Sequence, residues 1–313
     1  MNPQLQTASP HPCPVDDHVF LIGRPPVSDL IGFIRTMAID GQSRNQGDLV
    51  DEWRAANDHL RRLELKEAGL ADHPALGALP PELAEQRLRL LNDPIFRRAF
   101  QSIPSDVHLV DLDRLVVFQK HIDLTHTKKL HARLPENPSL EELFDFCLPM
   151  KREHPPVRLM QTAPNSYTFV SASNDFRFLQ TDVADGENAH EYQGIGSTTN
   201  ALTMMFGYGS NFLNVIALEG RLILGNGSHR AYALRERGIR HVPCVVQSLS
   251  RREELELAAS IDVQQRPDLY LRAKRPPMLK DYFDPALRMI VPVARKHRLI
   301  KVSFGIETMD VPA

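Results

Sequence analysis

The expected fold depends mainly on residues 214–246, which read NVIALEGRLILGNGSHRAYALRERGIRHVPCVV. Two short apolar runs at the start of this stretch are joined by Glu219-Gly220, a dipeptide typical of a two-residue hairpin turn. The second run leads into the glycine-bearing segment 225–230, which is followed by good helix formers and by Gly238, a residue that can end a helix. Strand character returns at 241–246. This order of elements predicts a compact α/β unit.

The segment Gly225-Asn226-Gly227-Ser228-His229-Arg230 joins a predicted strand to a predicted helix. The N–H groups in the first turn of a helix lack intrahelical partners, and together with the helix dipole they attract anions. The two glycines allow a ligand to approach the backbone closely, while the last three side chains add hydrogen-bond donors. The segment therefore indicates a site for phosphate, carboxylate or sulfate, and the alternative is ordinary turn chemistry.

These residues resemble the signature of the ParB/sulfiredoxin superfamily: a strand, a glycine-bearing loop ending in His-Arg, a helix and a Val-Pro strand. The matching residues are 227–238 and 241–246. Residues 262–269, Asp-Val-Gln-Gln-Arg-Pro-Asp-Leu, resemble the family's Glu-Asn-x-Gln-Arg-x-Asp-Leu segment and depart from it at Val263. The resemblance covers about residues 213–270, and residues 107–118 resemble the family's opening strand in character only.

The resemblance implies an α/β (α+β) ParB/sulfiredoxin-like domain that binds ATP or CTP together with Mg²⁺. The implied cofactor-binding residues are Gly225, Asn226, Gly227, Ser228, His229, Arg230, Gln265 and Arg266. Asp262 is the implied metal ligand. Phosphotransfer also needs a group that takes the proton of the acceptor, and the candidates are Asp113, His121 and Asp123. Each of these three also fits a plain surface position.

Two activities of the family do not fit this chain. Ser228 stands where sulfiredoxin chemistry needs a cysteine, and no helix-turn-helix pattern follows the domain as a partition protein requires. The favoured function is ATP- or CTP-dependent phosphotransfer or hydrolysis with a small-molecule acceptor. The alternative is a non-catalytic nucleotide-responsive protein that binds nucleic acid or a protein partner through its basic residues 270–301. In that case neutralising Arg272, Lys274 and Arg275 would abolish salt-dependent DNA binding. A nuclease is a third reading.

The 313 residues suggest three regions: a loose arm and helical region at 1–104, the ParB/sulfiredoxin-like domain at 105–270, and a short basic extension at 271–313. Residues 1–18 are expected to form the loose arm. One helix is predicted by an apolar stripe at i, i+4, i+7, i+11 and i+14 and is closed by Gly69; the stripe residues are Leu49, Trp53, Ala56, Leu60 and Leu63. A second helix is expected to start at Pro80-Pro81. These helices could form a lid, a homodimer interface or a partner site.

Further elements are expected from local signals. Capping boxes are predicted at Ser139 with Glu142 and at Ser250 with Glu253. Strands are expected at 157–161 and 167–179. Residues 181–211 are expected to form a long loop with a short helix at about 197–206. The glycines of 194–199 and 207–211 either line the ligand site or simply connect elements.

Bulk composition excludes several classes of protein. The net charge of −2 does not favour non-specific nucleic-acid binding. No apolar run is long enough for a membrane span, so the expected location is cytoplasmic. The three scattered cysteines suit reduced thiols, with Cys244 buried in a strand. His121, His126 and His131 recur every five residues, a spacing that does not place them on one helix face as a zinc motif requires.

Overall fold

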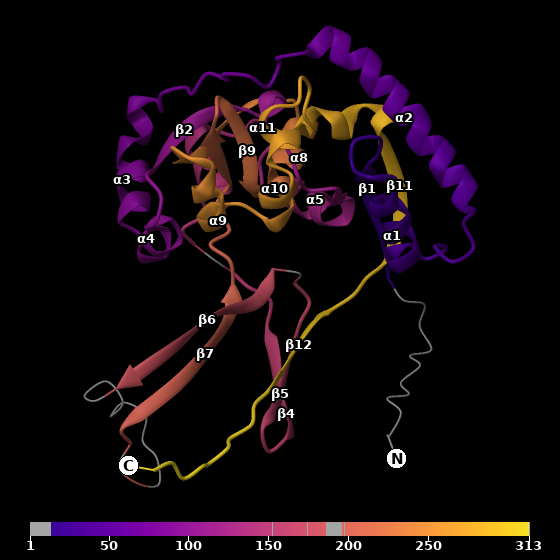
Figure 1. The fold of residues 1–313 in the computed structure, drawn as a ribbon. Helices are drawn as coiled ribbons and strands as arrows, with labels where there is room; N and C mark the ends of the chain where they lie inside the picture. The colour runs from indigo at the N-terminus through magenta and orange to yellow at the C-terminus, as the bar shows by residue number, and fades with distance from the viewer. Residues whose placement is uncertain (1–13, 152, 174, 186–195, 197, 313) are drawn as a thin grey trace. The chain divides into compact units, whose positions relative to one another are not determined.

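The computed structural model describes most of the chain, namely residues 14–151, 153–173, 175–185, 196 and 198–312. The structure is mixed α/β with four small sheets (Figure 1). Two compact units can be separated: unit 1 comprises residues 1–150 and 211–295, and unit 2 comprises residues 151–210 and 296–313. This division differs from the boundaries expected after residues 104 and 270, because segments from both ends of the chain pair within unit 1.

The residues that decide the fold form the four-stranded sheet of unit 1, with strand order β2-β10-β8-β9. Its strands are β2 (Ser105–Asp111), β8 (Asn214–Leu218), β9 (Arg221–Asn226) and β10 (His241–Ser248). β8 is parallel to β10, and the other neighbours are antiparallel. Glu219 and Gly220 have φ angles of 49° and 73°, as a two-residue hairpin turn with two left-handed residues requires. The expected order of strands is confirmed.

Helices cover both faces of this sheet (Figure 1). One face packs against α3 (Ala84–Asn92), α4 (Pro94–Phe100), α6 (Leu140–Cys147) and α8 (Ser228–Glu236). The other face packs against α9 (Leu255–Ala258), α10 (Ile261–Gln265) and α11 (Pro267–Leu271). Because side chains alternate along a strand, Val215 joins the first hydrophobic cluster and Ile216 the second.

The opening strand of the domain is shorter than expected. β2 ends at Asp111 and is followed by the 3₁₀ turn η2 (Leu112–Arg114), so the expected strand over 107–118 is broken. Val116 resumes pairing only as an isolated bridge to Ile223 and to Met278. The aliphatic residues that suggested one long strand are buried here in two hydrophobic clusters instead.

A second sheet of unit 1 has the order β11-β1-β3. Its strands are β1 (Val15–Leu21), β3 (His121–Asp123) and β11 (Arg288–Ala294). The prediction of a loose arm over 1–18 is therefore wrong for residues 15–18, while residues 1–13 lie outside the described residues. β1 pairs with a strand on each side and buries Val19 and Phe20 in different clusters, and these contacts are long-range and leave no local sequence signal.

The N-terminal helices pack on this second sheet. They are α1 (Val27–Met37) and α2 (Gln46–Glu67). The stripe predicted for α2 is confirmed, because Leu49, Ala56 and Leu60 are buried and Trp53 and Leu63 pack against the same cluster. Gly69 follows the helix with a φ of 77°. The helix expected from Pro80 begins as the 3₁₀ turn η1 (Pro81–Leu83) and continues as α3.

One predicted cap is confirmed and one is wrong. Ser139 and Glu142 form a capping box at the start of α6. Ser250 does not pair with Glu253; its N–H donates to Glu254 Oε2 at 2.7 Å, and the 3₁₀ turn η3 (Arg252–Glu254) follows. The acceptor is shifted by one residue because the N-cap is Arg251 and not Ser250, which places Glu254 at the third position of the turn.

Unit 2 consists of strands in its described part. One sheet has the order β12-β5-β4, with β4 (Val157–Ala163), β5 (Ser166–Ser171) and β12 (Arg298–Ser303). The other is a hairpin of β6 (Phe176–Asp185) and β7 (Asn200–Tyr208). The expected loop over 181–211 is therefore wrong where β6 and β7 pair. The helix expected at about 197–206 is wrong from Asn200 onward, where β7 begins, and residue 197 lies outside the described residues.

The last segment of unit 1 is built from two 3₁₀ turns and β11. The turns are η4 (Leu279–Phe283) and η5 (Pro285–Leu287). Residues 271–294 therefore pack into unit 1 instead of forming an appended basic extension. Among the described residues, no helix combines the length and apolar character that a membrane crossing needs.

Candidate functional site

The glycine turn sits where β9 ends and α8 begins. Gly225 lies at a bulge between β8 and β9, and a Cβ atom there would come within 2.4 Å of Asn214 Oδ1. Gly227 has a φ of 89°, and a Cβ atom there would lie 2.7 Å from Leu213 Cδ1. Asn226 Nδ2 donates to the carbonyl oxygen of Phe212 at 3.2 Å. The turn is therefore held in one conformation that only glycine fits at two positions.

Replacing Gly227 with alanine is expected to destabilise the protein by about 2–5 kcal/mol, because a left-handed residue with a side chain costs about 1–2 kcal/mol and overpacking adds about 1–3 kcal/mol. Gly238 is the matched control: its φ is 78°, but a Cβ atom there meets no atom within 4 Å. Urea unfolding followed by circular dichroism should give a larger loss for Gly227→Ala than for Gly238→Ala. Equal losses would show that Leu213 does not crowd the turn.

The start of α8 presents backbone donors. The first hydrogen bond inside the helix runs from Ala231 N–H to Gly227 O at 2.8 Å, so the N–H groups of the three preceding residues lack helical partners. Ser228 is buried, and its hydroxyl donates to Gln119 Oε1 at 3.2 Å. Tyr282 fixes Gln119 in turn by donating to its carbonyl oxygen at 2.6 Å. The serine thus ties the glycine turn to residues 119–120.

His229 is a neutral acceptor in this arrangement. Its Nε2 atom accepts a hydrogen bond from Asp123 N–H at 3.0 Å, and its ring meets that of His126 edge to face. Burial, together with the neighbouring histidines, lowers the pKa of His229 to about 3. The charge-assisted donation expected from this residue therefore requires a rearrangement, and its role in binding stays a prediction.

Arg230 points into the protein. Its guanidinium donates to the carbonyl oxygen of Asn211 at 2.9 Å and to Asn211 Oδ1 at 3.2 Å, and it lies over the Phe146 ring at 5.5 Å. Burial lowers the pKa of this guanidinium. Arg230 thus holds residues 211 and 146–147 against α8, and it is a poor residue with which to test ligand binding.

Two of the predicted catalytic residues lie beside His229. Asp123 caps α5 (Leu124–His131) by accepting from His126 N–H at 2.9 Å. His121 Nδ1 lies 3.1 Å from His18 Nδ1, so one ring donates and the other accepts. Burial, and then the neighbouring His18, lowers the pKa of His121 to about 4. Asp123 and His121 are therefore brought to the turn, where His18 joins them.

Asp113, the third predicted catalytic residue, is not brought to the turn. Its carboxylate binds Arg235, in the last turn of α8, and lies 3.0 Å from Arg240 Nε. α8 rises about 1.5 Å per residue, so Arg235 lies about 10 Å from the start of the helix. Asp113 thus stabilises the far end of α8.

The predicted metal ligand Asp262 belongs to an ion-pair network. Arg266 Nη2 lies 3.0 Å from Asp262 Oδ1, and Lys120 Nζ lies 3.4 Å from the same oxygen. Lys120 Nζ also lies 2.9 Å from Asp29 Oδ2, which comes from α1. Gln265 is exposed. Val263, which replaces the family's asparagine, is fully buried in the second hydrophobic cluster.

A narrow hollow opens beside this network. About 10 Å³ of it accepts a water-sized sphere, which is room for one water molecule. Its lining residues are Leu21, Pro25, Val117, Phe118, Gln119, Lys120, Arg266, Leu269, Tyr270 and Pro277. A ligand larger than water therefore fits only if some of these lining side chains move.

No family is assigned. No family model matches the chain, and neither the curated proteins nor the solved structures give a significant match. The geometry of the site therefore carries the functional argument. Within the described residues, no group of three or more histidine, cysteine, aspartate or glutamate side chains is arranged to hold a metal ion.

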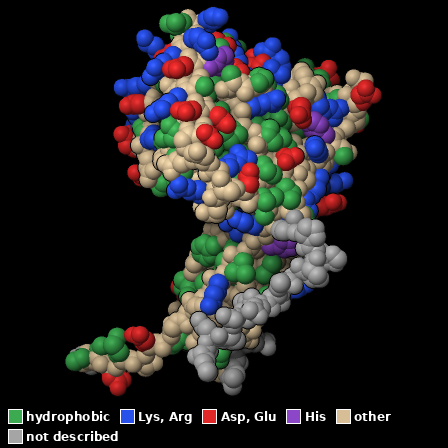
Figure 2. Space-filling view, turned by 90° about the vertical axis from the view of Figure 1, so that its right-hand side faces the viewer, with side chains coloured by type: hydrophobic (Ala, Val, Ile, Leu, Met, Phe, Trp, Pro, Cys, Tyr) green, Lys and Arg blue, Asp and Glu red, His purple; other side chains and the backbone are tan. Residues whose placement is uncertain are grey.

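The basic residues of 270–301 are largely paired within the protein. Arg275 is 1% exposed and binds Asp281 and Glu67, so its neutralisation would break a buried network instead of removing a DNA contact. Other paired cations include Arg272 with Glu219, Lys280 with Glu67, and Arg295 with Asp16. Lysine and arginine alternate with acidic residues over the visible face of unit 1 (Figure 2). No broad face of one charge is seen in that view.

Other candidate features have simpler explanations. Cys147 and Cys244 are buried free thiols, and burial raises the pKa of Cys147 to about 12. His131 pairs with Glu236 at 3.0 Å, and it does not join His121 and His126. Residues 194, 195 and 197 of the first glycine-rich loop lie outside the described residues. Gly207 belongs to β7.

The sequence did not point to Lys120, Asp29 or His18. Lys120 directly precedes the predicted residue His121, so its charge was a local signal that could have been used. Asp29 and His18 belong to the N-terminal segment, which joins the site only through the pairing of β1 with β3 and the packing of α1. No local pattern marks such contacts.

Proposed function

We propose that this protein binds a nucleoside triphosphate, ATP or CTP, at the turn that starts α8, within a ParB/sulfiredoxin-like domain. One observation carries the proposal. Lys120 stands between the carboxylates of Asp29 and Asp262, next to Gln119, the residue that accepts a hydrogen bond from Ser228 at the turn. A cation and the donors at the start of α8 are thus linked through Gln119, and cations together with helix N-terminal donors are the combination that binds phosphate.

The ion-pair network supplies the groups that a phosphate needs. Lys120 and Arg266 neutralise Asp262 in the structure, and both line the narrow hollow. A triphosphate would attract these two cations away from Asp262, because its charge is greater than that of one carboxylate. The move would widen the hollow and release two carboxylates, those of Asp29 and Asp262.

These carboxylates fit the Mg²⁺ ion that accompanies a nucleotide. Magnesium is commonly bound through one or two carboxylates plus substrate phosphates and keeps several waters. Asp29 and Asp262 would hold it, and the ion would neutralise part of the phosphate charge. Asp29 Oδ2 pairs with Lys120 Nζ at 2.9 Å, so this oxygen would become available to the ion once Lys120 has moved to the phosphate.

Phosphotransfer or hydrolysis is the reaction class that we propose for this site. Burial keeps His121 neutral, with a pKa of about 4, so it is a weak base that could take the proton of the acceptor only once the bound phosphates raise that pKa, and Asp123 lies next to His229. Asp113 is left out of this proposal because Arg235 and Arg240 hold it at the far end of α8. A small-molecule acceptor would supply the hydroxyl that receives the phosphoryl group.

Isothermal titration with ATP, CTP, GTP and ADP in the presence of Mg²⁺ tests the binding. We expect the native protein to bind ATP or CTP, and Lys120→Met to weaken binding tenfold or more, since loss of one charge-assisted contact is worth about 1.5–3 kcal/mol. Lys128→Met, at an exposed position on α5, is the matched control and should bind as the native protein does.

Absence of nucleotide binding by the native protein would contradict the proposal. Unchanged binding in both Lys120→Met and Asp262→Asn would also contradict it, because the ligand would then sit elsewhere. Binding without product formation, in assays with candidate acceptors, would identify a nucleotide-responsive protein that lacks catalysis. The paired state of the basic residues near the C-terminus gives no support to a nucleic-acid site there.

A further inference from the structure

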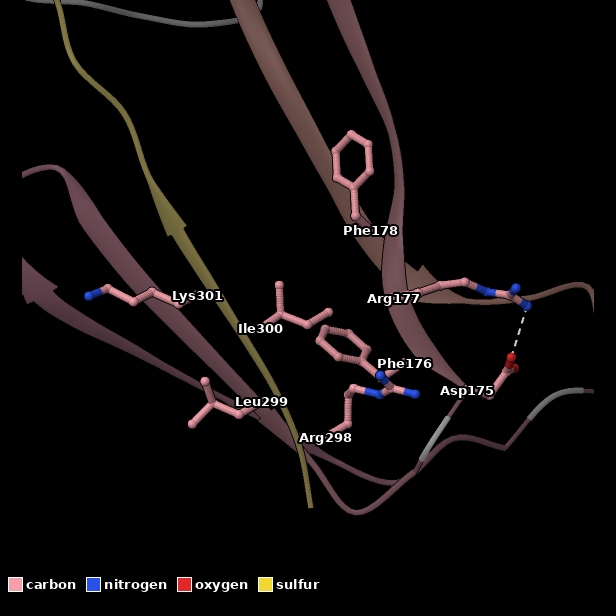
Figure 3. A pocket seen from close by; sticks show the side chains of 8 residues that line it. All are labelled: Asp175, Phe176, Arg177, Phe178, Arg298, Leu299, Ile300 and Lys301. Atoms are coloured by element: carbon pink, nitrogen blue, oxygen red, sulfur yellow. Dashed lines mark hydrogen bonds and ion pairs between the residues drawn. The ribbon is translucent and has the colours of Figure 1, made fainter. Parts of the chain in front are cut away.

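A hollow in unit 2 lies between two strands that are not paired with each other. It has a volume of about 500 Å³ and is lined by residues 175–178, at the start of β6, and by residues 298–301 of β12 (Figure 3). Neighbouring side chains of a strand point to opposite faces, so four consecutive residues can line one space only along the edge of the strand. The hollow therefore follows an edge of β12.

This edge of β12 has no strand partner in the part of the chain that the structure describes. β12 lies at one end of the sheet β12-β5-β4, and β6 pairs with β7 alone. An open edge presents N–H and C=O groups that can pair with another extended chain. The hollow therefore lies where one more strand could join the sheet.

The hydrogen bonds to β5 show which backbone groups of β12 remain open. Just beyond the strand, Phe304 N–H donates to Asn165 O at 3.2 Å, and the antiparallel register of β12 with β5 has no bulge. Opposite residues of an antiparallel pair alternate between hydrogen-bonded and non-hydrogen-bonded positions. Counting back in steps of two, Ile300 bonds to β5. The N–H and C=O groups of its neighbours Leu299 and Lys301 therefore point to the open edge.

The lining of the hollow is positively charged. It contains three cations, Arg177, Arg298 and Lys301, and one carboxylate, Asp175, which accepts from Arg177 at 2.8 Å. The described residues of unit 2 hold six lysines or arginines and six acidic residues, so half of these cations gather here with one of the acids. Arg298 and Lys301 lie on opposite faces of β12. An added strand would therefore meet a cation on either face.

Apolar side chains complete the lining. Ile300 points toward Phe176, and Phe178 stands beside them on β6 and is 47% exposed (Figure 3). Leu299 lies on the other face of β12 and is 60% exposed. The four lining residues of β12 span about 13 Å, at about 3.3 Å per residue. The ligand that matches this lining is an extended chain with both apolar and acidic side chains.

We propose that the hollow binds an extended acidic segment of a partner protein, which pairs with Leu299 and Lys301 and adds a fourth strand to the sheet β12-β5-β4. A peptide backbone supplies donors and acceptors at the spacing of a strand edge, which a nucleic acid or a small anion does not. A second copy of β12 would place cations against cations, and like charges on paired strands are destabilising. This proposal does not depend on the nucleotide site.

Fluorescence anisotropy of the full chain with a labelled peptide tests the proposal. The probe alternates glutamate with valine over about eight residues, enough to span the hollow. One control peptide alternates lysine with valine, and another is the acidic peptide with every peptide nitrogen methylated, which keeps its charge but cannot donate to a strand edge. We expect the native protein to bind the acidic probe at least tenfold more tightly than either control.

A variant of β12 tests the open edge. Leu299→Pro removes an N–H that points outward and leaves the bonds of Ile300 to β5 in place, since proline is tolerated on an edge strand at such a position. It should weaken binding of the acidic probe tenfold or more. Leu299→Thr keeps the N–H group and is the matched control, which should bind as the native protein does.

Three results would overturn the proposal. The first is absence of binding between the native protein and the acidic probe. The second is equal binding of the acidic and the lysine peptides, because the charge of the lining would then play no part. The third is equal binding of the acidic probe and its methylated form, because the ligand would then not pair with the edge. This last comparison uses the native protein, so it decides even if Leu299→Pro disturbs β12.

Discussion

Replacing Arg275 with methionine is expected to destabilise the fold by about 3–5 kcal/mol, the usual cost of removing one partner from a buried ion pair. Arg275 is 1% exposed and makes two bonds to Asp281, at 2.6 and 3.1 Å, and one to Glu67 at 2.9 Å. Without the guanidinium, Asp281 stays buried with Met278 N–H as a donor but without Arg275 to neutralise it. Urea unfolding followed by circular dichroism measures the loss.

Two further variants test whether the unpaired charge of Asp281 causes the loss of stability. Adding Asp281→Asn to Arg275→Met should recover part of the loss, because the amide oxygen can still accept from Met278 N–H while the buried charge is gone. Arg272→Met removes an arginine with an exposed side chain, three residues away, and should cost less than about 1 kcal/mol. A loss below about 1 kcal/mol for Arg275→Met would show that the network contributes little.

Acidification from pH 7 to pH 5 is expected to destabilise unit 1 by about 2 kcal/mol for each of His121 and His229. Burial lowers the pKa of these rings to about 4 and about 3, while an unfolded chain titrates near the ordinary value of 6.5. As the pH falls below about 6.5, the unfolded state binds protons first, so stability falls until the folded-state pKa is reached.

The pH range in which stability is lost distinguishes the protonation of histidines from the protonation of carboxylates. Arg295, through a side-chain bond, lowers the pKa of Asp16, so that carboxyl loses its contribution only below its ordinary value of 3.8. His229→Gln keeps an acceptor near the position of Nε2, and His121→Asn keeps one near the position of Nδ1. Each variant should reduce the slope of the free energy of unfolding against pH between pH 6.5 and 5. The exposed His241→Gln is the control and should leave the slope unchanged. An unchanged slope in both buried variants would contradict the prediction.

Local patterns in the sequence were enough to predict the central elements. The hairpin at Glu219-Gly220, the glycine turn and α8 depend on the conformations that glycine allows, and α2 depends on an apolar stripe with helical spacing. Each of these signals is contained within a short stretch of the sequence. The structure accordingly places these elements where they were expected.

The remaining elements depend on partners far along the chain. β1 is a strand because β11 and β3 flank it, and β7 is a strand because β6 pairs with it. The same limit applies to the site. The sequence indicated the turn and Asp262 but missed Lys120 and Asp29, whose relevance depends on tertiary contacts. Arg230 was expected to face a ligand, and burial against Asn211 gives it a packing role instead.

The pairing of β1 with β11 has a consequence for folding during synthesis on the ribosome. Residues 15–21 leave the ribosome long before their partner strand at 288–294, so this sheet cannot be completed until Ala294 has been made. Contacts of such long sequence separation slow folding. During synthesis, the apolar side chains of β1, α1 and α2 therefore lack the strand β11 against which they pack. Chaperones that bind nascent chains would bind these side chains at this stage.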